Sequence, residues 1–134
     1  MTSIERIVAA VDELVAHVVE SRDVDELVTR LRSTCAATDD GRWAIDLGAG
    51  PIERLVVDDW AHEPVAVIDL ELRDGRDDAA ALIDGLGLDR RRALPGGGLS
   101  SAAETTVGET VISISALSER DRLLGLSLTR FEPR

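Results

Sequence analysis

The sequence predicts an α+β fold in a single domain, in which an N-terminal two-helix hairpin packs on a small mixed sheet that includes a C-terminal β-hairpin. Two patterns carry this prediction. Apolar residues recur at helical spacing in the first part of the chain, and apolar and polar residues alternate near its end. The length of 134 residues suits one domain, and a hydrophobic content of 44% is enough for a core.

Two helices are expected at the start of the chain. Thr2 and Glu5 form a capping-box pair, and the apolar residues of 4–18 fall on one helical stripe. Asp23 begins a second stripe over residues 24–35. The connection between the two stripes is short, so the helices are predicted to pack as an antiparallel hairpin.

The middle of the chain mixes strand and helix signals. Residues 43–47 alternate in a way that favours a strand, and residues 65–72 also favour a strand, although a helix stays open for both segments. Pro51 suits the first turn of a helix, so a helix is predicted after it with Ile52, Leu55, Val56 and Trp60 on its inner face.

The second half of the chain predicts one more helix, a loop and a hairpin. Residues 79–86 read as a helix, and residues 94–104, which contain three successive glycines, are expected to form a flexible loop. Residues 112–116 and 124–129 alternate on either side of a polar turn at 118–121, which predicts the C-terminal β-hairpin. With this hairpin, the sheet is expected to have three or four strands.

The charge of the chain excludes several classes of function. There are 26 acidic residues against 15 basic ones, and the formal net charge is −11. Such a charge repels nucleic-acid phosphates and anionic membranes, whereas it attracts basic proteins. The chain has no apolar run long enough to cross a bilayer and no signal-peptide pattern at its start, so a cytoplasmic protein is expected.

These properties favour a non-enzymatic protein-binding module. Small acidic bacterial proteins without catalytic constellations often neutralise or escort another protein, as immunity-type inhibitors and chaperones do. The contact is expected to be lined by five carboxylates: Asp39, Asp40, Asp58, Asp59 and Glu63. A homo-oligomer joined through the exposed edge of the C-terminal hairpin is a further alternative.

A glycine segment supports a second hypothesis. Residues 45–50, Ile-Asp-Leu-Gly-Ala-Gly, resemble the first motif of methyltransferases that use S-adenosylmethionine, where a strand ends in a glycine turn and a helix follows. The resemblance implies a small protein that binds a cofactor or nucleotide, with an acidic residue of the next strand near the ribose. The residues carried over are Asp46, Gly48, Gly50 and either Asp69 or Glu71.

The same glycines allow another interpretation. Gly48–Leu55 resembles a Gly-Ala-Gly-Pro-Leu-Glu-x-Leu segment of small uncharacterised bacterial proteins. That resemblance implies that the glycines separate two packed helices, with Pro51 starting the second, and that no cofactor is needed. It would also make residues 43–47 helical.

The remaining candidates for chemistry predict no catalytic or metal site. His17 and His62 are the only histidines, and neither has enough further ligands at suitable spacing. Cys35 lies on the apolar stripe of the second helix and is expected to be a core residue. The Arg90–Arg92 cluster follows a predicted helix end, where positive charge is favourable, and contact with an anion stays an alternative.

Overall fold

Two amphipathic helices open the fold, as predicted. The computed structural model describes residues 2–39, 43–60 and 65–132. Helix α1 spans Ser3–Glu20 and α2 spans Val24–Cys35. The Glu5 amide donates to Thr2 Oγ1 over 3.1 Å, and the Thr2 amide donates to the Glu5 carboxylate over 3.3 Å. The capping box is therefore confirmed, and it satisfies backbone donors that the first turn leaves without partners.

The sheet is larger than the sequence predicts. The described residues form eight strands, and every neighbouring pair in the sheet is antiparallel, whereas a small mixed sheet was expected. Their bounds are β1 Ala37–Asp39, β2 Ala44–Leu47, β3 Ile52–Trp60, β4 Ala66–Leu72, β5 Arg90–Ala93, β6 Leu99–Val107, β7 Thr110–Glu119 and β8 Arg122–Phe131. The order in space is β1-β2-β3-β4-β8-β7-β6-β5. The third helix, α3, spans Ala79–Gly85, within the predicted segment.

The C-terminal hairpin predicted from the alternating pattern is confirmed as β7 and β8. Arg120 and Asp121 connect the two strands with φ angles of 52° and 62°. Two adjacent residues in the left-handed region match the twist of a tight hairpin. Strand β8 then also pairs with β4, so the hairpin joins the N-terminal half of the sheet to the rest.

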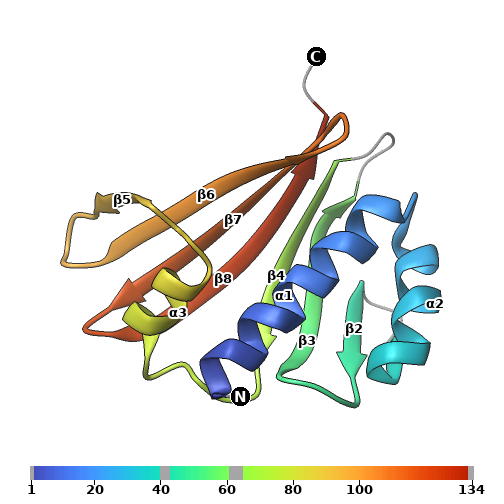
Figure 1. The fold of residues 1–134 in the computed structure, drawn as a ribbon, viewed down its shortest axis with the longest axis horizontal. Coiled ribbons are helices and arrows are strands. Elements are labelled where there is room, and N and C mark those ends of the chain that lie inside the picture. The colour runs from blue at the N-terminus through green and yellow to red at the C-terminus, as the bar shows by residue number, and fades with distance from the viewer. Residues whose placement is uncertain (1, 40–42, 61–64, 133–134) are drawn as a thin grey trace.

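The helices cover one face of the sheet (Figure 1). In β4 this face is marked by four buried residues that alternate with partly or largely exposed ones, namely Ala66, Ile68, Leu70 and Leu72. They join side chains from the helices in one largely aliphatic core, to which Ile7, Leu27 and Leu82 contribute. No described helix or strand packs on the opposite side of the sheet, which we call the open face. None of the described helices is both long enough and apolar enough to span a bilayer.

The helix predicted after Pro51 is wrong, because Ile52–Trp60 forms strand β3. The physical reason is a pair of irregularities in its pairing with β4, between Ile52 and Arg54 and between Val57 and Asp59. Each inserts one extra residue, so the buried positions fall at 52, 55, 57 and 60 instead of at every second residue. Spacings of three residues then imitate the periodicity of a helix.

The prediction of a flexible loop over residues 94–104 is also wrong in extent, because strand β6 begins at Leu99. Only a short turn over residues 94–98 separates β5 from β6, closed by a hydrogen bond of 2.8 Å from the Leu94 amide to the Gly98 carbonyl. The basic cluster Arg90–Arg92 belongs to edge strand β5 and not to a helix end. Its middle member still meets the preceding helix, because Arg91 Nη2 lies 2.7 Å from Asp84 Oδ1 of α3.

One buried cation joins the helical layer to the sheet. Arg130, in β8, is 6% exposed, and its Nη1 donates to the Val18 carbonyl over 2.5 Å and to the Ser21 carbonyl. These carbonyls lie at the end of α1, where the helix leaves acceptors without internal partners and carries partial negative charge. Arg130 therefore holds the end of α1 against the middle of the sheet.

Candidate functional site

A β-bulge places two neighbouring aspartates on the open face. Asp59 pairs with Val67, which alternates with the buried residues of β4 and therefore lies on the open face. Asp58 is the extra residue of the bulge and is hydrogen-bonded to Asp69, also on that face. In a regular strand one of two successive side chains would point toward the helices. The bulge instead lets both carboxylates stay exposed on the same side.

The carboxyl groups of Asp58 and Asp69 lie against each other across β3 and β4. The hydrogen bond that protonated Asp69 donates to the Asp58 carboxylate, partial burial and the negative charges of Asp58 and Glu71 together raise the pKa of Asp69 to about 6. The pair thus shares a proton at mildly acidic pH, because two adjacent carboxylates repel each other when both are ionised. A cation from outside the chain would relieve this repulsion.

Three further charged residues extend this cluster across the open face toward β2. Asp46 pairs in register with Arg54, which pairs with Glu71. Arg54 Nε lies 2.6 Å from Asp46 Oδ1, so the row has one arginine between two acidic side chains. We call the carboxylates of this surface the acidic strip: Asp46, Asp58, Asp59, Asp69 and Glu71.

The structure brings together only some of the residues predicted to bind a partner. Asp58 and Asp59 belong to the acidic strip, while Asp40 and Glu63 lie outside the described residues. Asp39 is exposed at the end of edge strand β1, where its register partner is the buried Ile45. It therefore lies on the helix-bearing side and is separated from the strip by the sheet.

The glycine segment predicted for the cofactor alternative forms a loop between two antiparallel strands, β2 and β3. The Gly48 amide donates to the Ala36 carbonyl over 3.3 Å, and the Ala49 amide donates to the Cys35 carbonyl over 3.1 Å. These amides thus cap the C-terminal end of α2. Such an end carries partial negative charge, whereas a loop that holds a phosphate or cofactor offers free amides and a helix N-terminus.

The other residues of that alternative lie apart from the loop's amides. Asp46, Asp69 and Glu71 project from the open face, while Gly48 approaches α2 so closely that an added Cβ would lie 3.2 Å from the Ala36 Cβ and oxygen. Arg73 holds the loop by donating from Nε to the Gly50 carbonyl over 2.8 Å and from Nη2 to the Leu47 carbonyl. The glycines serve packing and turn geometry in this arrangement.

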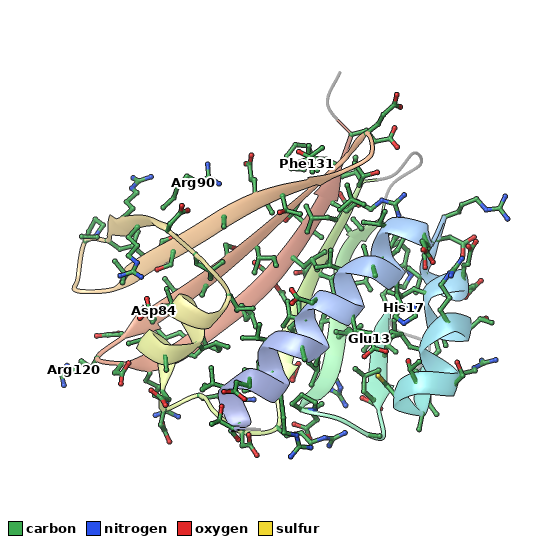
Figure 2. All side chains as sticks on the ribbon, in the orientation of Figure 1. Glu13, His17, Asp84, Arg90, Arg120 and Phe131 are labelled. Atoms are coloured by element: carbon green, nitrogen blue, oxygen red, sulfur yellow. The ribbon has the colours of Figure 1, made fainter. Side chains whose placement is uncertain are left out.

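The described residues offer little support for metal or nucleophilic chemistry. No group of three or more His, Cys, Asp or Glu side chains within them is placed to hold a metal ion. Cys35 is partly buried against the core, as predicted. His17 lies on α1, and its Nε2 is 3.9 Å from the Glu13 carboxylate (Figure 2). His62 lies outside the described part of the chain. Arg90 lies 3.4 Å from Glu104 on the neighbouring strand.

Sequence reasoning missed a hollow in the middle of the open face. It lies beside the acidic strip, above Gly125 in β8, and Asp69 forms part of its wall. One signal was available, since Gly125 takes the place of a polar residue in the alternation of leucine and polar residues over 124–129. A glycine inside a strand often marks a place where another group approaches the backbone.

Comparisons of this chain with protein-family models, with curated proteins and with solved structures find no match.

Proposed function

We propose that this chain is a non-enzymatic protein-binding module that holds a basic surface of another bacterial protein against its acidic strip. The observation that carries the proposal is the position of the strip on the one face of the sheet that no described element covers. An immunity-type inhibitor or a chaperone uses a surface in this way to neutralise or escort its partner. The partner would be a protein, since the net charge of −11 repels nucleic acids and anionic membranes.

Electrostatics supports a basic partner in particular. The contact between Asp58 and Asp69 costs free energy when both carboxyls are ionised, and a lysine or arginine placed between them would remove that cost. The negative field of the whole chain would also accelerate the approach of a basic protein, most strongly at low salt. A rigid sheet presents these charges from strands and not from loops, which favours a defined contact.

The proposal is tested by comparing two triple variants with the same net charge. In the strip variant, Asp58, Asp59 and Asp69 become asparagine. In the control, three exposed carboxylates of the helices and a turn become asparagine: Asp12, Asp25 and Asp77. Each variant changes the formal net charge from −11 to −8. Wild type and both variants are immobilised, exposed to a lysate of the host, and the retained polypeptides are identified by mass spectrometry.

We expect a polypeptide of positive net charge that wild type and the control retain and the strip variant loses. Measured with the purified partner, the affinity of the strip variant should fall by about tenfold or more, and its salt dependence should be shallower. Equal retention by the two triple variants would show that only overall charge matters and would refute the assignment to the strip.

A further inference from the structure

Gly125 borders an irregularity in the pairing of β7 with β8, because Leu124 is an extra residue between Gly125, which pairs with Leu117, and Leu123, which pairs with Ser118. It lies inside β8, a central strand of the sheet, and its φ is not in the left-handed region. A Cβ built on it would meet no atom within 4 Å. Close packing within the described residues and the φ angle therefore do not require glycine, although glycine is common beside a β-bulge. Glycine weakens a strand relative to residues with side chains, so its presence at this position carries a cost in stability.

The absence of a side chain at Gly125 leaves a hollow of about 130 Å³ on the open face. Three serines line it, Ser127 on β8 itself, Ser115 on β7 and Ser100 on β6. The hydroxyls of Ser115 and Ser127 are 2.8 Å apart and hydrogen-bonded to each other. The volume is that of roughly four water molecules at ~30 Å³ each, which is enough for the end of one long side chain.

The wall of the hollow carries one charge, on Asp69. This residue pairs with Ser127 across β4 and β8, and on its other side it meets Asp58 of the acidic strip. The hollow therefore offers a carboxylate and several hydroxyl oxygens, all of which can accept hydrogen bonds. The lining also includes Ala116, Leu117 and Leu126, so a side chain with an apolar stem and a positively charged end that carries several donors matches it.

We propose that the hollow over Gly125 receives the end of a lysine or arginine side chain from the basic partner, with the Asp69 carboxylate as its counter-charge. This inference rests on the proposed function and gives it a specific anchor. The strip attracts the basic surface, and the hollow fixes its position by admitting one cationic side chain. The neighbouring hydroxyls replace part of the water that this cation loses on binding.

A substitution that fills the hollow with a side chain tests the inference while keeping the fold. Gly125→Val places a side chain in the hollow. Its Cβ would meet no atom within 4 Å, and valine favours strand structure. The matched control is Thr129→Val, on the same strand and face, about 13 Å away along the strand. Asp69→Asn removes the counter-charge with little change in shape. Thermal unfolding followed by circular dichroism checks that each variant is folded.

The probes are a short oligolysine and a short oligoarginine, titrated into the ¹⁵N-labelled chain and followed by NMR and calorimetry. With wild type and Thr129→Val, we expect the amides of Ser115, Gly125 and Ser127 to shift together on binding. In Gly125→Val and Asp69→Asn the affinity should fall by about tenfold, as for loss of one charge-assisted hydrogen-bonded group. A preference for one probe identifies whether the anchor is lysine or arginine.

The outcomes separate this inference from the proposed function. If Gly125→Val binds as tightly as wild type while the strip variant binds weakly, the hollow is not an anchor and the strip remains the docking surface. If neither Gly125→Val nor the strip variant weakens binding of a basic peptide, both proposals fail. If the amides around Gly125 shift with protein concentration alone, the occupant is a second copy of this chain and the inference is overturned.

Discussion

The guanidinium of Arg130 lies over the indole of Trp60, with 5.9 Å from the guanidinium carbon to the ring centre. The same guanidinium donates to the Val18 and Ser21 carbonyls at the end of α1, and the Trp60 Nε1 donates to the Arg22 carbonyl over 3.2 Å. Two side chains from β8 and β3 thus bind the carbonyls of the α1–α2 connection. These hydrogen bonds link the end of α1 and the residues after it to the sheet.

Replacing Arg130 should therefore destabilise the fold strongly. In Arg130→Leu, buried carbonyls lose their donor, and we expect the free energy of unfolding to fall by about 2–4 kcal/mol. Arg122→Leu is a suitable control, because Arg122 is exposed on the same strand and its loss should change stability by less than about 0.5 kcal/mol. Urea unfolding measures both. Equal midpoints for the two variants would contradict the role assigned to Arg130.

The same substitution at two glycines should have opposite effects. A side chain at Gly48 would meet Ala36 Cβ and the Ala36 oxygen at 3.2 Å, so Gly48→Val should destabilise the chain by about 1–3 kcal/mol. At Gly125 there is free space, so Gly125→Val should leave the unfolding midpoint unchanged or raise it. If Gly48→Val kept full stability and lost binding of a small ligand, the cofactor alternative would gain support instead.

Asp69 should make stability depend on pH in a direction unusual for a carboxylate. Its pKa rises to about 6 in the folded chain, above the ordinary value of 3.8, so folding takes up a proton between these values. The contribution of Asp69 to stability is full at low pH and is lost as pH rises through about 6. Above that pH, Asp69→Asn should be more stable than wild type, by at most about 1 kcal/mol because solvent screens this exposed pair.

The difference between wild type and Asp69→Asn should disappear below about pH 3, where the Asp69 carboxyl is protonated in both the folded and the unfolded states. Urea unfolding at several pH values measures it. A constant difference across this range would show that the effect comes from packing and not from titration of the carboxyl.

Binding of a basic partner should have the opposite pH dependence to this stability term. As pH rises from about 5 to about 7, Asp69 loses its proton and the acidic strip gains negative charge, so affinity for an oligolysine should increase. Asp69→Asn should flatten this increase. A His17→Gln, His62→Gln double variant, which lacks both imidazole groups, is the control and should keep the wild-type dependence. Isothermal titration calorimetry at matched ionic strength gives the affinities.

Where local chemistry decides the structure, the sequence predicted it well. The capping box at Thr2 needs only residues within one helical turn, and the alternation in β7 and β8 is a local consequence of one buried face. The helix 79–86 was also found from its own apolar spacing. These elements account for the α+β class and for the layer of helices on a sheet.

The failures share a different cause, which is pairing between strands that are distant in the sequence. The bulges of β3 arise from its register with β4, and they give buried positions a spacing that resembles a helix. Strand β6 lacks a strong pattern because small residues occupy it, yet it pairs with β7 along its whole length. Small side chains such as Ala102 and Ala103 carry little periodic signal, so only the partner strand reveals them as strand.

The candidate site shows the same contrast between features that local sequence predicts and features that depend on pairing between distant strands. Asp58 and Asp59 could be chosen from sequence as exposed carboxylates, but Asp69 and Asp46 were assigned to a cofactor that the loop geometry does not favour. Their grouping depends on the β2–β3–β4 register, which no local pattern encodes. The hollow over Gly125 needs four strands to be aligned before it exists.

The position of β8 has a consequence for how the chain assembles. It follows all the other described strands along the chain, yet it lies between β4 and β7 in the middle of the sheet. During synthesis, β1–β4 and β5–β7 therefore emerge before the strand that connects them. Until β8 is added, β4 and β7 each have one unpaired edge. Pairing between strands that are distant in the sequence is slow, and unpaired edges can pair wrongly. We therefore expect completion of the native sheet to be a late step in folding.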